Sequence, residues 1–148
     1  MRFKLITAAV VAIGAASGSS MATPLGSNAL QITVSGIKSD KGVIRIAVCP
    51  PQAGFPECKA SVARTASLKI VNGTAHAVLD GLPAGTYAVS AFHDANDNGK
   101  LDTFVGIPKE GYGFSRNPAF KPRAPRFDET EITITSNSAT AIKLRYLL

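Results

Sequence analysis

Apolar and polar residues alternate with a period of two along much of the chain. The segment 30–35, for example, reads LQITVS, with an apolar residue at every second position. Such alternation predicts a strand that buries one face and exposes the other to water. We predict strands over residues 30–35, 43–48, 66–71, 74–79, 86–92, 131–135 and 141–146.

Turn-forming residues separate neighbouring strands of this set. Residues 40–42, Asp-Lys-Gly, stand between the first two strands and predict that they form a hairpin. Asn72 and Gly73 stand between the third and fourth strands, and an Asn-Gly pair is the strongest two-residue hairpin signal. The sequence therefore predicts two hairpins of consecutive strands.

About seven short strands without a convincing amphipathic helix are typical of an all-β protein, a single β-sandwich of immunoglobulin-like size. The length of 148 residues fits one domain. One segment, 93–130, lacks a good strand and contains five of the aromatic residues, which is too aromatic for disorder. We therefore expect residues 93–130 to form a long ordered loop over one end of the sandwich.

The N-terminus has the pattern of an export signal. Arg2 and Lys4 precede an apolar run that is too short to span a bilayer, and a small-x-small cleavage site ends at Ala22. We expect residues 1–22 to be a signal peptide and residues 23–148 to form the mature domain, which contains no further span. The sequence thus predicts a periplasmic or secreted protein.

The net charge does not point to a partner once this signal is removed. The chain has 16 basic and 10 acidic residues, and loss of Arg2 and Lys4 leaves 14 against 10, a charge of +4. The remaining cations are scattered and form no basic arm or recognition helix. We therefore expect no nucleic-acid partner.

Cys49 and Cys58 are the only two cysteines. The residues between them are rich in turn formers, and an oxidising compartment allows such a pair to close. We predict a structural disulfide. Two free thiols are the alternative, and a metal site is disfavoured because CxxC spacing and neighbouring histidines are absent.

An acidic loop opens the 93–130 segment, with oxygen-bearing side chains at alternate positions and Gly99 at the sixth. This is the first part of a D-x-[DN]-x-[DN]-G calcium loop, in which alternate side chains converge on one centre and the glycine permits a sharp turn. Hard oxygen donors favour calcium over transition metals. The predicted calcium ligands are the side chains of Asp94, Asn96, Asn98 and Asp102 and the backbone carbonyl of Lys100.

This loop is not an EF-hand, because position twelve is Val105 rather than glutamate and no helix flanks it. Glu110 is a candidate additional ligand. The expected affinity is low, with a dissociation constant of about 0.1–1 mM. The alternative interpretation is a set of Asx turns in which the loop side chains bind their own backbone.

The same carboxylates are also compatible with an enzymatic function. Asp94, Asp102 and Glu110 are candidate acid and base groups of a cell-envelope hydrolase that acts on a glycan or a peptide. His93 and His76 lack a nucleophile motif, and we expect His93 to orient the loop by hydrogen bonding. Carboxylates beside Asn and Gly are more often ligands or caps, so catalysis is the second interpretation.

The motif 106–115, GIPKEGYGFS, places Tyr112 and Phe114 on one side of an extended chain. With His93, these aromatics are a candidate binding surface that stacks on sugar rings or holds a peptide. The alternative is a structural cap over the open end of the sandwich.

Three segments of this sequence, LPAGTYAV at 82–89, FHDANDNGKLD at 92–102 and GIPKEGYGFS at 106–115, resemble a bacterial exported family known as domain of unknown function 2141. The resemblance covers about residues 28–148. It implies a transthyretin-like or immunoglobulin-like sandwich and supplies no reaction. The weaker LPAGTYAV piece recurs in many sandwich modules, where Tyr87 can pack at a corner of the sandwich.

The leading hypothesis is an exported, non-enzymatic module that binds calcium through residues 94–102. Its aromatic loop would be presented to a partner in the envelope, either a protein or a glycan. A purely structural accessory domain without a ligand is the third interpretation, after the hydrolase.

Overall fold

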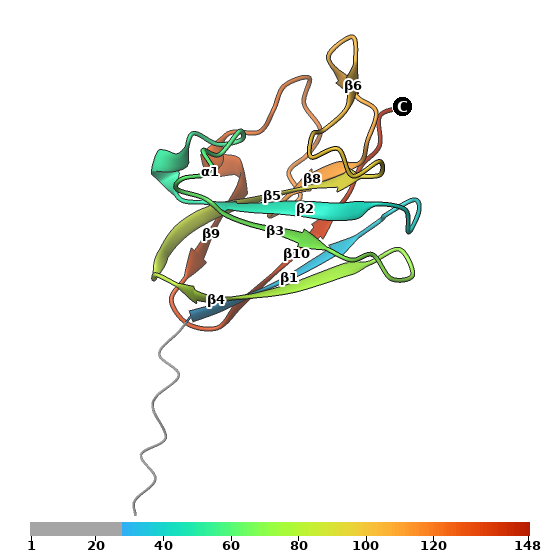
Figure 1. Ribbon diagram of the computed structural model, residues 1–148. Helices are drawn as coiled ribbons and strands as arrows, with labels where there is room; N and C mark the ends of the chain where they lie inside the picture. Colours follow the sequence, from blue (N-terminus) through green and yellow to red (C-terminus); the bar gives the residue numbers. More distant parts are fainter. Residues whose placement is uncertain (1–27) are drawn as a thin grey trace, which may run out of the picture.

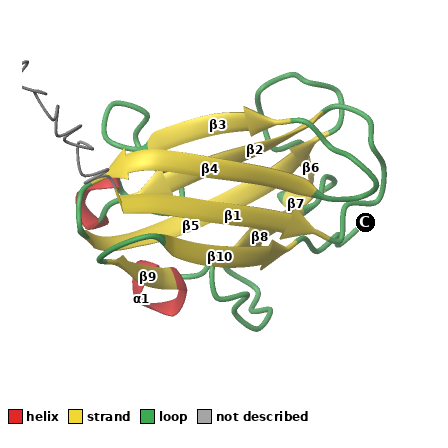
Figure 2. Cartoon of the chain, turned by 90° about the horizontal axis from the view of Figure 1, so that it is seen from below, coloured by secondary structure: helices red, strands yellow, loops and turns green. Residues whose placement is uncertain are grey.

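Two β-sheets pack face to face in the computed structural model, which describes residues 28–148 (Figure 1; Figure 2). The smaller sheet has the strand order β10–β1–β4, and the larger has the order β3–β2–β5–β8, with β9 also paired to β5. The strands are β1 (Asn28–Ser35), β2 (Val43–Cys49), β3 (Arg64–Leu68), β4 (Ala75–Leu82), β5 (Gly85–Asp94), β6 (Thr103–Phe104), β7 (Ile107–Pro108), β8 (Tyr112–Phe114), β9 (Glu131–Ile134) and β10 (Ser138–Lys143), and the helices are the 3-10 turn η1 (Pro51–Ala53) and α1 (Phe127–Thr130).

The predicted all-β sandwich is confirmed, and each predicted strand overlaps an observed one. Alternation explains the core, because every second side chain of a strand points between the sheets. On β1, for example, Ile32 is buried whereas Gln31 is exposed. The core includes Leu30, Ile32, Val34, Ile44, Ile46, Val48, Val89, Ala91, Ile134, Ile142 and Leu144.

The two predicted hairpins are wrong. β1 pairs with β4 and β10, whereas β2 pairs with β3 and β5, so the first two strands lie in different sheets. β3 and β4 are likewise in different sheets, although Val71 and Thr74 exchange two backbone hydrogen bonds across the expected Asn-Gly turn. A tight turn reverses the direction of the chain. It does not determine whether two strands, each with one apolar face, pair edge to edge in one sheet or stack face to face across the core.

A side chain joins these two turns. Asp40, in the turn after β1, accepts hydrogen bonds from the backbone N–H groups of Asn72 at 3.1 Å and Gly73 at 2.9 Å. Asn72 and Gly73 both have positive φ angles, of 51° and 71°, as the tight turn requires. Both turns therefore serve as corners between the sheets.

Tyr87 packs at a corner of the sandwich, as the sequence suggested. Its side chain is buried, and its hydroxyl donates a hydrogen bond of 2.8 Å to the carbonyl of Pro83. This contact fixes the chain where it enters the long central strand β5.

The segment 93–130 is ordered, but it is not a strand-free loop. It contains the β6–β7 ribbon, the short strand β8 and the helix α1. β8 extends the larger sheet by pairing with β5, with Tyr112 opposite Phe92. Strands of two or three residues escape a periodicity search because they are shorter than the window it needs.

The predicted signal peptide, residues 1–22, and the predicted start of the mature domain at residue 23 lie outside the described residues. Between residues 28 and 148, no helix has the length and apolar character needed to cross a membrane.

Candidate functional site

The acidic loop begins at the end of β5, where Asp94 is fully buried. Its Oδ2 accepts hydrogen bonds from Arg45 Nε at 2.5 Å and from the backbone N–H of Gly99 at 2.8 Å. Its Oδ1 accepts a bond of 2.9 Å from the backbone N–H of Asn98. Burial raises the pKa of Asp94, but the bonds from Arg45, Gly99 and Asn98 outweigh it and hold the pKa below its ordinary value.

Arg45 fastens the loop to the sheet. It lies on β2, and its guanidinium also donates to Asp97 at 2.7 Å and to Ser67 at 3.0 Å. Sequence reasoning did not single out this residue. Its only signal was an arginine at an outward position of an otherwise apolar strand.

Glu110 closes the loop from the other side. Its Oε1 accepts a hydrogen bond of 3.0 Å from the backbone N–H of Ala95, and its Oε2 accepts one of 2.9 Å from that of Asp102. The side chain is buried, so one carboxylate ties together the two ends of the loop. Both oxygens of this candidate calcium ligand are therefore engaged by backbone donors.

The remaining predicted ligands meet at the outer side of the loop. The Asn96 and Asn98 amides donate to the two carboxylate oxygens of Asp102, at 2.8 and 3.0 Å. Asn98 Oδ1 accepts a bond of 2.9 Å from the backbone N–H of Lys100. These side chains are brought together, whereas Asp94 faces Arg45. Over the described part of the chain, no three His, Cys, Asp or Glu residues come together in a way that could hold a metal ion.

His93 faces the core rather than the surface. Its Nε2 lies 2.7 Å from the carbonyl of Lys41, which can only accept, so this nitrogen carries the proton. Its Nδ1 lies 2.9 Å from the hydroxyl of Tyr146, which itself accepts from the backbone N–H of Lys38. Burial raises the pKa of Tyr146. His93 thus joins the turn after β1 to the C-terminal segment, and it is separate from Tyr112 and Phe114.

Tyr112 and Phe114 lie on the outer face of the larger sheet. They are half-buried and belong to β8, next to Ser90 and Phe92 of β5. Alternation turns these four side chains outward, because Ala91 between Ser90 and Phe92 is part of the core. They form the floor of an open groove of about 1060 Å³.

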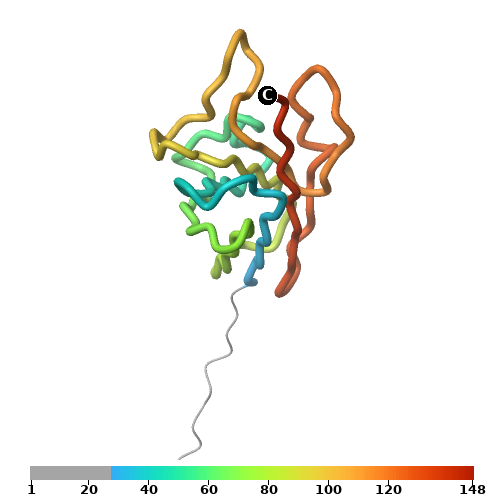
Figure 3. The backbone as a smooth tube through the Cα atoms, turned by 90° about the vertical axis from the view of Figure 1, so that its right-hand side faces the viewer, coloured from blue at the N-terminus to red at the C-terminus, as the bar shows by residue number. Residues whose placement is uncertain are grey.

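Four segments form the walls of this groove. They are the end of the acidic loop with the β6–β7 ribbon, the disulfide loop, the segment 120–124 and the C-terminus. Figure 3 shows the C-terminus between the β6–β7 ribbon and the segment near residue 120. The wall residues are Pro56, Glu57, Leu101, Thr103, Gly106, Ile107, Pro108, Phe120, Lys121, Pro122, Arg123, Ala124, Leu147 and Leu148.

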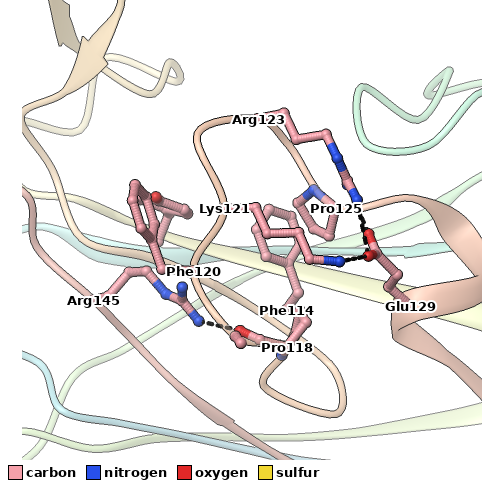
Figure 4. A pocket seen from close by; sticks show the side chains of 10 residues that line it. Phe114, Pro118, Phe120, Lys121, Arg123, Pro125, Glu129 and Arg145 are labelled. Carbon is pink, nitrogen blue, oxygen red and sulfur yellow. Dashed lines mark hydrogen bonds and ion pairs between the residues drawn. The ribbon is translucent and has the colours of Figure 1, made fainter.

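A small pocket adjoins the groove beneath residues 118–125 (Figure 4). There Lys121 and Arg123 both bind the carboxylate of Glu129, and the guanidinium of Arg145 donates to the carbonyl of Pro118 at 2.6 Å. Hydrogen bonds from Arg123, Lys121 and the backbone hold the pKa of Glu129 far below its usual range. This cluster fixes one wall of the groove.

The disulfide between Cys49 and Cys58 is present, with a Cα–Cα distance of 5.8 Å, so that prediction is confirmed. The loop it closes also packs against the groove. The ring of Phe55 meets that of Phe114 edge-on, with centroids 5.7 Å apart. The disulfide loop therefore supports the groove floor.

The fold and these features define a class: a β-sandwich module with a groove on its outer face and an acidic loop at its end. The family model described as an uncharacterised protein conserved in bacteria, DUF2141, matches residues 32–143. The chain belongs to this family. No curated protein and no solved structure matches the chain.

Proposed function

We propose that this protein is an exported, non-catalytic binding module of the cell envelope, and that its ligand site is the groove on the larger sheet. The observation that carries this proposal is the floor, where Tyr112 and Phe114 remain half-exposed between four walls. Binding sites for small molecules are concave, largely apolar and rich in aromatic side chains. The groove has these properties, so the aromatics serve as a receiving surface rather than only as a cap.

The state of the carboxylates supports a non-catalytic role. A general acid or base needs an oxygen that can reach the substrate proton. Both oxygens of each candidate, Asp94, Asp102 and Glu110, already accept hydrogen bonds from the chain. Asp94 is also held ionised, which does not suit a general acid. No observation favours the hydrolase.

A neutral apolar dye tests the groove. We expect the fluorescence of Nile red to rise with the purified protein and to stay low with Ser90→Phe, whose ring would fill the floor. Gln31→Phe is the matched control, because Gln31 is an exposed residue on the central strand of the other sheet. Thermal unfolding checks that both variants fold. Equal dye binding by Ser90→Phe and the wild type would contradict the proposal.

We further propose that the outer side of the acidic loop binds calcium through Asn96, Asn98, Asp102 and the Lys100 carbonyl. The contacts that support this are the two amides directed at the Asp102 carboxylate. Calcium would need the amide oxygens of Asn96 and Asn98 in place of their nitrogens, so that three side chains direct oxygen at one cation. The bonds that these oxygens accept from the backbone N–H groups of Asn98 and Lys100 would then break. Asp94 remains with Arg45 in this arrangement, as the support of the loop rather than a ligand.

Calorimetry with calcium tests this second proposal. We expect a dissociation constant of about 0.1–1 mM for the wild type and at least a tenfold weaker one for Asp102→Asn, which loses a charged ligand. Asp80→Asn, an exposed aspartate on β4, is the control and should bind like the wild type. No heat from the wild type, or equal heat from Asp102→Asn, would overturn the calcium site.

A further inference from the structure

Positive charge gathers at one wall of the groove. The pocket beside the groove is lined by three cations, Lys121, Arg123 and Arg145, and by one carboxylate, Glu129, which leaves an excess of two positive charges. Lys121 and Arg123 line the groove as well, whereas the one carboxylate side chain in the groove lining, Glu57, belongs to the disulfide loop on another wall. Lys121 uses one of its three N–H donors on Glu129, so donors remain for a further anion.

The rest of the groove suits hydrocarbon better than sugar. A glycan would bury many hydroxyl groups, each of which needs a hydrogen-bond partner. The lining offers few uncharged polar side chains, namely Ser90, Thr103 and the Tyr112 hydroxyl. Phe92, Phe120 and the other apolar side chains instead present a surface that an alkyl chain can cover.

From this combination we propose that the groove binds an anionic amphiphile, with its alkyl chain on the aromatic floor and its carboxylate or phosphate head beside Lys121 and Arg123. This inference rests on the groove being a binding site. A volume of about 1060 Å³ is sufficient for a ligand with a long alkyl chain. The cations of the 120–124 wall select the head group at that wall, and the apolar floor supplies the affinity.

Calorimetric titration with four amphiphiles of equal chain length tests the head group. We use decanoate, decyl phosphate, decanol and decyltrimethylammonium, all below their micellar concentrations. Decanoate and decyl phosphate should bind about tenfold tighter than decanol, because unit charges near a protein surface attract strongly. Decyltrimethylammonium should bind more weakly than decanol. Inorganic phosphate should give no heat, because it lacks the alkyl chain.

Two variants separate the charge from the groove. Lys121→Met keeps an apolar stem and removes the ammonium, so decanol binding should persist while the preference for decanoate falls to about threefold or less. Lys69→Met, at an exposed lysine outside the groove lining, should keep the full preference. Ser90→Phe should abolish binding of all four amphiphiles.

The outcomes distinguish a failure of the amphiphile inference from a failure of the proposal that the groove is a binding site. Equal affinity of the wild type for decanol and decanoate overturns the anionic head group and leaves the groove as an apolar site. If Nile red binds in the groove but decanoate gives no heat, the amphiphile is wrong and another class of ligand, such as an aromatic peptide, is indicated. If neither binds, or if both bind equally to Ser90→Phe, the groove itself is not the site.

Discussion

Among single residues, Asp94 has the largest role in the acidic loop. It is buried, it binds Arg45 on the neighbouring strand, and it accepts the backbone N–H groups of Asn98 and Gly99. An aspartate with these partners fixes the start of the loop to the sheet and sets its curvature. This role explains the residue without any metal.

Asp94→Asn should therefore lower the free energy of unfolding by about 2 kcal/mol at pH 7, since it weakens a charged hydrogen bond in a buried position. The pKa of Asp94 is lowered in the folded state, so its contribution is present above the unfolded value of about 3.9 and is lost as the pH falls through the folded value. Urea unfolding of both proteins between pH 3 and 7 measures this difference.

Asp97→Asn is the control for that comparison. Asp97 binds the same guanidinium, but its side chain is largely exposed, so its loss should change stability by less than about 1 kcal/mol. If the two variants are equally stable at pH 7, Asp94 does not hold the loop.

The sequence predicted the oxygen-bearing positions of this loop but not how they are used. Residue spacing identifies Asp94, Asn96, Asn98 and Asp102 because a curled loop brings alternate positions together. The partner Arg45 is 49 residues away in sequence, and only the register of β2 against β5 places it beside Asp94. Local spacing contains no information about that register.

At the scale of elements, the segment around β8 explains two of the three glycines of the motif 106–115. A Cβ on Gly111 would lie 2.3 Å from the Tyr146 ring, and one on Gly113 would lie 2.7 Å from the side chain of Ile142. Contact with the C-terminal strand and its extension thus excludes larger residues at these two positions, one just before β8 and one within it. Tyr112, between the glycines, is consequently free to face the groove.

Gly111→Ala should destabilise the protein by about 1–3 kcal/mol, because the added methyl group meets an aromatic ring that is held by hydrogen bonds. A double-mutant cycle with Tyr146→Ala measures the coupling by urea unfolding. The methyl group should cost at least 1 kcal/mol less in the Tyr146→Ala background, where the ring is absent. Additive effects would show that the ring is not the obstacle.

The sequence predicted the longer strands but not their pairing or the short strands, and the reasons are physical. Strands of four residues or more carry enough alternation to be found, and each of the seven was. The pairing of consecutive strands was wrong because the Asn72–Gly73 turn fits either a hairpin or a corner between sheets. The short strand β8 was missed, although Tyr112 and Phe114 do lie on one side of it, as their spacing predicts.

At the scale of the whole molecule, the groove arises from segments that are far apart in sequence. Its floor comes from β2, β5 and β8, and its walls come from the disulfide loop, the β6–β7 ribbon, the segment 120–124 and the C-terminus. The sequence motif 106–115 contributes Tyr112 and Phe114 to the floor and residues 106–108 to one wall, whereas the other walls come from distant segments. The amphiphile hypothesis therefore depends on the arrangement of the whole domain.

The pairing of β1 with β10 has a consequence for how the domain is made. These are the first and last strands of the described chain, and they lie side by side in parallel. As the chain is synthesised from its N-terminus, β1 lacks one neighbour, and the core lacks Ile142 and Leu144, until residues 138–144 have emerged. The sandwich can therefore be completed only after β10 has been made, so the first strand of the domain waits for the last one before it gains both neighbours.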